Sequence, residues 1–117
     1  MTHPASQLDL EFLDELLDGD KEFAEELFET YRESAAASLA EARQMLVEGN
    51  ADAYRPFHTL KGASASVGLT GLRELAKTFE VDAKAGEYVR CRERLDELAD
   101  AVRMGQERLS QYLESME

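Results

Sequence analysis

A histidine followed three residues later by a lysine, and then by a glycine, is the part of this sequence whose residue types are best suited to chemistry. The imidazole of an unperturbed histidine is mostly neutral and nucleophilic at about pH 7, so His58 is a candidate nucleophile. Lys61 places an ammonium group one helical turn away. Gly62 costs a helix about 1 kcal/mol relative to alanine, and close approach by another molecule would account for its presence. This pattern predicts an exposed nucleophile beside a cation, on a surface with little bulk.

The segment around His58 separates into two faces when it is read as a helix, at about 100° per residue. One face is small and apolar enough to pack, and the other carries the imidazole and the ammonium group. The packing face contains Pro56, Leu60, Ala63, Ser64 and Val67, and the opposite face contains Tyr54, His58, Lys61, Gly62 and Ala65.

The motif His58-x-Leu60-Lys61-Gly62-x-Ser64-x-x-x-Gly68, followed by Leu72, Leu75 and Glu80, resembles the histidine-containing phosphotransfer (HPt) domain of phosphorelays. The helical pattern extends this resemblance over nearly the whole chain. The resemblance implies a four-helix bundle with an exposed histidine. That histidine would carry a phosphoryl group between receiver-domain aspartates, or from a histidine kinase to such an aspartate.

The same resemblance implies roles for individual residues. His58 would be the phosphoryl acceptor, and Lys61 would stabilise the phosphoryl oxygens through a charge-assisted hydrogen bond. Glu80 either orients the ring of His58 by a hydrogen bond or is an ordinary surface glutamate. Independently of the resemblance, the position of Ser64 on the packing face places it on the core side, where it is expected to bond back to the carbonyl four residues earlier.

The expected partner is a response-regulator receiver domain, a hybrid sensor histidine kinase, or both. The resemblance implies that the receiver supplies the aspartate and Mg²⁺, so this chain would need no cofactor or metal of its own. The sequence has neither a GxxxxGK[ST] loop nor a kinase glycine-rich loop, which predicts a phosphoryl carrier rather than an enzyme with an ATP site. We expect docking around His58, through Tyr54, Arg55, Lys61, Gly62 and Ala65.

Composition narrows the class of partner and the expected location. The chain carries 25 acidic against 13 basic residues, a net charge of −12, which should repel nucleic acids and anionic membranes. No apolar run approaches the roughly 20 residues that span a bilayer, and the N-terminus lacks the regions of a signal peptide. A single domain over residues 1–117, monomeric and cytoplasmic, is the expectation.

Hydrophobic periodicity predicts an all-α protein: an antiparallel four-helix bundle with a short extra N-terminal helix. The short helix should cover about 7–17, with Ser6 as its N-cap, and the second 21–48, capped by Asp20. The third should begin near Asp52, although Pro56 could instead kink it or be its first residue. Thr70 should cap the fourth, and the last should run from about Glu87 to the end. The second helix should pack through Phe23, Leu27, Tyr31, Ala35, Leu39, Ala42 and Leu46.

Other classes of function fit the residues less well. A helical bundle that binds a receiver or kinase without accepting phosphate is the main alternative. Di-metal bundle enzymes use Glu-x-x-His pairs, and here Arg55 stands three residues before His58. Cys91, the only cysteine, falls on an apolar stripe without a nearby histidine, so it is expected to be a buried thiol.

Overall fold

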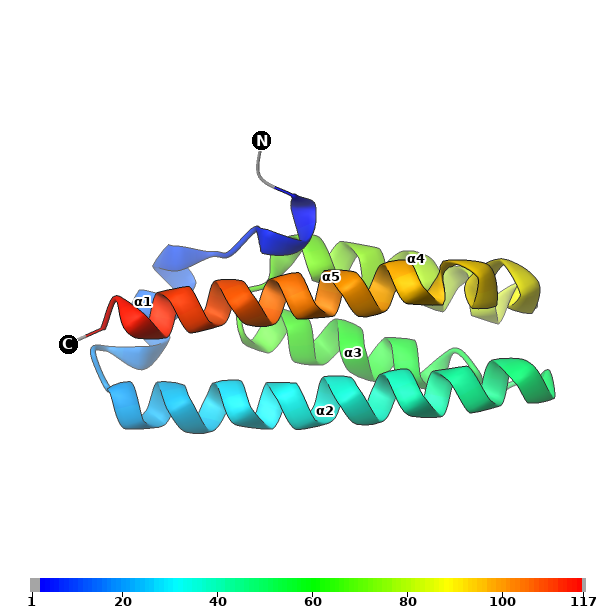
Figure 1. Cartoon of the computed structure of the whole chain (residues 1–117), viewed down its shortest axis with the longest axis horizontal. Helices are drawn as coiled ribbons and strands as arrows, with labels where there is room; N and C mark the ends of the chain where they lie inside the picture. Colours follow the sequence, from blue (N-terminus) through cyan, green and yellow to red (C-terminus); the bar gives the residue numbers. More distant parts are fainter. Residues whose placement is uncertain (1–2, 117) are drawn as a thin grey trace.

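A computed structural model, which describes residues 3–116, shows a chain of helices joined by short turns. In chain order the elements are the 3-10 helix η1 (Pro4–Ser6) and the α-helices α1 (Leu10–Leu17), α2 (Lys21–Glu48), α3 (Arg55–Ser66), α4 (Thr70–Lys84) and α5 (Tyr88–Glu114). Figure 1 shows α2, α3, α4 and α5 running side by side, with the short α1 at one end of the bundle. This confirms the predicted all-α four-helix bundle with a short extra N-terminal helix.

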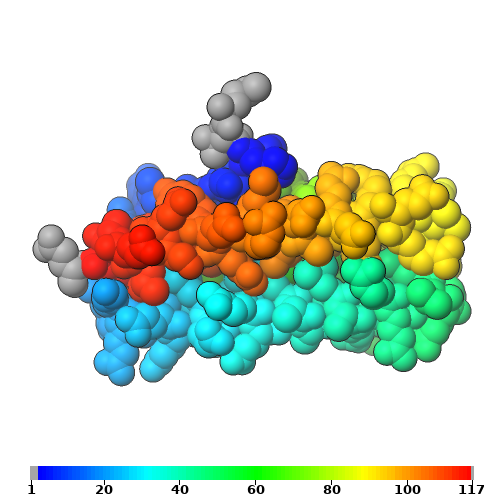
Figure 2. Space-filling model, viewed as in Figure 1, coloured from blue at the N-terminus to red at the C-terminus, as the bar shows by residue number. Residues whose placement is uncertain are grey.

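The four long helices form a square in which α3 and α5 occupy opposite corners. The backbones of α3 and α5 each lie close to those of α2 and α4 but not close to each other. Figure 2 shows α5 lying along α2 on the face in view. The outer side of α3 is therefore left to solvent or to a partner.

Helix starts follow local capping chemistry, although two of the predicted caps are wrong. The side chain of Asp20 accepts a hydrogen bond from the backbone N–H of Phe23 at 3.0 Å, as expected for the start of α2. The cap of α1 is Asp9 rather than Ser6, because Ser6 already belongs to η1. Thr70 is the first residue of α4, not its cap, and makes no side-chain capping bond.

Helix α3 begins at Arg55, three residues later than the preferred start near Asp52, so that prediction is wrong. Pro56 stands in its first turn, where the missing N–H has no helical partner to lose. A turn leads into the helix, and the N–H of Arg55 donates to the carbonyl of Asp52 at 2.9 Å. His58 is consequently the fourth residue of α3, and its own N–H donates to the carbonyl of Tyr54.

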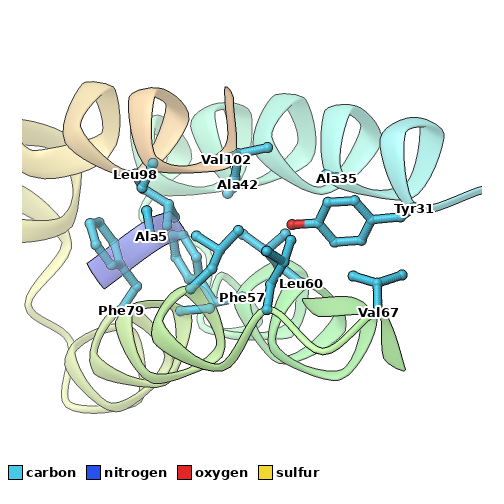
Figure 3. Close-up of a cluster of buried hydrophobic side chains, with 14 of the residues drawn as sticks. Ala5, Tyr31, Ala35, Ala42, Phe57, Leu60, Val67, Phe79, Leu98 and Val102 are labelled. Carbon is cyan, nitrogen blue, oxygen red and sulfur yellow. The ribbon is translucent and has the colours of Figure 1, made fainter. Parts of the chain in front are cut away.

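The core lies where α3 and α4 face α2 and α5. Phe57 of α3 and Phe79 of α4 pack with ring centroids 5.3 Å apart, and both are almost fully buried. Figure 3 shows these rings in one cluster with Leu60 and Leu98. Full burial of such side chains contributes about 1.5–3 kcal/mol each, so α3 and α4 are held together directly behind the outer face of α3.

The predicted packing stripe of α2 is correct except at Phe23, which is 39% exposed. Leu27 and Leu39 are half-buried and pack against the core, and Ala24 and Phe28, which the prediction did not include, are buried. Phe28 turns inward because it packs edge-on against Tyr112 near the end of α5, with ring centroids 6.2 Å apart.

The N-terminal segment is packed closely against α4 and α5. Ala5 is buried, and a Cβ added at Gly71 would collide with the backbone carbonyl of Pro4. A Cβ at Gly105 would come within 3.0 Å of Leu69 and 3.4 Å of the carbonyl oxygen of Ala5. Both glycines therefore make room for a neighbouring chain segment.

Candidate functional site

His58 lies on the outer face of α3, with its side chain 65% exposed. The ring is held on one side only, because Nδ1 lies 2.7 Å from Oε2 of Glu80 on α4. Burial of Phe57 and Leu60 on the other side of α3 fixes which face His58 occupies. The imidazole is thus anchored at one nitrogen and open to solvent elsewhere.

Glu80 is buried, with 4% of its surface exposed. Of the two possibilities that the sequence left open, it is therefore not the ordinary surface glutamate. Its Oε1 accepts from Nζ of Lys61 at 2.7 Å, and Nζ of Lys84 lies 3.7 Å from its Oε2. Burial on its own would raise the pKa of Glu80, but the hydrogen bonds from Lys61 and His58 outweigh that effect and hold the pKa below its ordinary value. The side chain is therefore an ionised carboxylate at neutral pH.

The ionisation of Glu80 determines the tautomer of a neutral His58 ring. A carboxylate can only accept hydrogen bonds, so Nδ1 of His58 must carry the proton that is shared with Oε2 at 2.7 Å. The lone pair of a neutral ring then lies on Nε2, which points away from the anchor. The arrangement presents a nucleophilic nitrogen in one orientation.

Lys61 and His58 are connected through Glu80, because both side chains bind its carboxylate and neither binds the other directly. Lys61 is only 29% exposed and is paired with the same carboxylate that holds the ring. Lys84 is a second cation of this group, and sequence reasoning missed it. It lies over the ring of Tyr54, 5.1 Å from the centroid. Its spacing of four residues from Glu80 on one helix was the available signal.

The predicted partner-binding residues line two depressions beside the anchored ring. Gly62 has open space in front of it, since an added Cβ would meet no heavy atom within 4 Å. Ala65 lines the same depression as Lys61 and Gly62. Tyr54 and Arg55 line the other depression, together with His58, Thr59, Glu80 and Lys84.

Ser64 belongs to the core and not to the site. Its hydroxyl is buried and lies 3.2 Å from the hydroxyl of Tyr31 on α2, so the expected bond back to its own helix is replaced by a bond between helices. Burial raises the pKa of Tyr31 to about 12, although the bond to Ser64 acts in the opposite direction. The pair fixes α3 against α2 behind the site.

Further features bear on the alternative functions. Within residues 3–116, no three or more His, Cys, Asp or Glu side chains are grouped so that they could hold a metal ion. Cys91 is buried, and its thiol donates to the carbonyl of Phe79. None of the helices in the described part of the chain is long and apolar enough to cross a membrane.

Comparison with known proteins identifies a family. The family model described as "Hpt domain" matches residues 26–116, which is most of the chain and includes His58, Lys61 and Glu80. Searches among curated proteins and among solved structures return no match.

Proposed function

Because this chain belongs to the Hpt domain family, whose members carry phosphoryl groups in two-component signalling, we propose that His58 is its phosphoryl acceptor. His58 exchanges the group with an aspartate of a receiver domain or receives it from a histidine kinase. The observation that carries this proposal is the exposed imidazole whose Nδ1 is anchored on the buried carboxylate of Glu80.

The geometry supports an in-line displacement at phosphorus. The lone pair on Nε2 of His58 attacks the phosphorus of an aspartyl phosphate, an N–P bond forms, and the P–O bond to the aspartate breaks. The aspartate leaves as a carboxylate with the bonding electrons. The proton on Nδ1 stays in its hydrogen bond with Glu80, whose negative charge offsets the positive charge that the ring acquires.

Lys61 and Lys84 supply positive charge for the phosphoryl group that arrives. Both ammonium groups already lie within 4 Å of Glu80. A phosphoryl group on Nε2 adds close to two negative charges, so it competes with Glu80 for these cations and can form charge-assisted hydrogen bonds with them. The carrier contributes a positioned nucleophile and two cations, and the Mg²⁺ needed for transfer belongs to the receiver.

Transfer from phosphorylated receiver domains tests this proposal. A panel of receivers carrying labelled aspartyl phosphate is mixed with the wild type, with His58→Gln and with His3→Gln. His3 is the only other histidine and serves as the matched control. Label that is acid-labile and alkali-stable should appear on the wild type and His3→Gln, and be absent from His58→Gln.

A binding module that accepts no phosphate is the alternative, and the same experiment separates it. Such a module would bind a receiver, for example in a pull-down with a member of the panel, while the wild type stayed unlabelled. Equal labelling of wild type and His58→Gln would also contradict the proposal, because the acceptor would then lie elsewhere.

A further inference from the structure

Positive charge is concentrated on the two helices that build the site, although the protein as a whole is strongly acidic. Helices α3 and α4 together carry five of the 13 basic residues and three of the 25 acidic ones, which leaves eight basic and 22 acidic residues elsewhere. The face around His58 is thus locally positive on a negative molecule.

A depression next to the anchored histidine carries this positive charge without any carboxylate in its lining. Lys61, Arg73 and Lys77 surround it, and Gly62 and Ala65 form its low, uncharged part. Arg73 and Lys77 are exposed residues of α4, which we call the α4 basic rim. It adjoins the candidate site, because Lys61 belongs to both.

The two residues of the α4 basic rim are not engaged in holding the fold together. Lys77 forms no ion pair with any residue in 3–116, and Arg73 pairs only with its exposed neighbour Glu74, at 2.7 Å. Exposed pairs of this kind contribute at most about 1 kcal/mol to stability. A structural role therefore does not account for the rim.

We propose that the α4 basic rim receives an acidic surface of the partner protein beside its phosphorylated aspartate, and that it steers the encounter. This inference rests on the proposed function. An aspartyl phosphate is an anion, so a protein that presents one brings negative charge to His58. The net charge of −12 repels an anionic partner surface at long range, and a local patch of opposite sign then selects the productive orientation.

Charge reversal with a matched control tests the steering role. The double variant Arg73→Glu/Lys77→Glu is compared with Arg92→Glu/Arg103→Glu, which makes the same change in net charge on α5, diagonally opposite α3. The two double variants remove equivalent interactions. Arg103, like Arg73, forms an ion pair with an exposed glutamate. Arg92, like Lys77, has no ion-pair partner among the described residues. Transfer is measured with the receiver from the panel that labels the wild type fastest.

The expected result is a salt-dependent loss confined to the rim variant. At about 0.05 M salt the Debye length exceeds 10 Å, so charges on the two surfaces still interact. The rim variant should then accept phosphate at least about tenfold more slowly than the control variant, because electrostatic steering changes association rates 10-fold to 1,000-fold. The difference should disappear as salt rises toward about 1 M, where charges are screened within about 3 Å. A difference that persisted unchanged at high salt would indicate misfolding or lost packing, and it would overturn the steering role.

A small phosphodonor separates failure of this inference from failure of the proposed function. Phosphoramidate gives its phosphoryl group to an imidazole nitrogen and releases ammonia, without any docking. It should label wild type and rim variant at equal rates. Equal receiver-dependent rates for the rim and control variants at low salt would overturn the inference while the acceptor role stood. No label on the wild type from either donor would overturn both.

Discussion

Replacing Glu80 by glutamine tests the cluster at the site without reference to any partner. Glutamine keeps the shape of the side chain and can still accept a hydrogen bond from Nδ1 of His58, but it removes the negative charge that Lys61 and Lys84 share. Breaking a fully buried ion pair costs about 3–5 kcal/mol. The two lysine side chains are 29% and 57% exposed and can turn to water, so we expect a loss of about 1–2 kcal/mol.

The sign of the pH dependence follows from the depressed pKa of Glu80. In the folded protein this carboxyl releases its proton at a lower pH than in the unfolded chain, where the ordinary value is 4.5. Its contribution to stability is therefore fully present above that value and is lost as pH falls through the folded-state pKa. Below the folded-state pKa, wild-type Glu80 is as neutral as glutamine.

Urea denaturation followed by helical circular dichroism measures the free energy of unfolding from neutral pH down to about pH 3. The difference between wild type and Glu80→Gln should be largest above pH 4.5 and should shrink below it. Glu107→Gln, at an exposed ion pair on α5, is the control and should stay within about 0.5 kcal/mol of wild type. A difference that was absent at neutral pH, or independent of pH, would refute the reasoning.

Further substitutions probe the surface and the packing behind it. Gly62→Gln should stabilise the protein by up to about 1 kcal/mol, since nothing lies within 4 Å of an added Cβ, and thermal melts measure this. The same substitution should slow receiver-dependent transfer at least about tenfold by displacing the partner, which the transfer rate measures. Gly71→Ala should lower the free energy of unfolding by about 1–3 kcal/mol, because its Cβ would collide with Pro4. Tyr31→Phe should lower the free energy of unfolding by about 1–2 kcal/mol, and adding Ser64→Ala should lower it little further, because the two hydroxyls bond to each other. If the losses of the two single variants simply added in the double variant, the pairing would be contradicted.

The helices and their order could be predicted from the sequence because hydrophobic spacing and turn residues act locally. The bounds of α2, Lys21–Glu48, are those that the pattern predicts, and Asp20 caps the helix as expected. Local rules failed where tertiary contacts decide. Phe23 and Phe28 both suit an inner face, and Phe28 is the one that packs against Tyr112 of α5. Thr70 has capping chemistry but is the first residue of α4 rather than its cap.

Helical periodicity predicted the part of the candidate site on α3, whereas Glu80 on α4 was suggested only by the family resemblance, which left its environment open. The face with His58, Lys61 and Gly62 follows from helical periodicity within one segment. The burial of Glu80 depends on how α4 packs against α3, which no local pattern contains. The convergence of three basic side chains on that carboxylate depends on the same packing. Lys84 was not among the predicted site residues, because the sequence did not establish whether its partner Glu80 is buried or exposed.

The central claim is that Glu80 holds the proton on Nδ1 of His58 and leaves Nε2 as the atom that receives the phosphoryl group. Nitrogen-15 NMR of His58 measures both parts, first in the free protein above the ordinary titration range of imidazole, at about pH 8, and then after phosphorylation. The expected result is a protonated Nδ1 in the free protein and coupling between phosphorus and Nε2 afterwards. A ring protonated on Nε2, or a phosphoryl group on Nδ1, would contradict it.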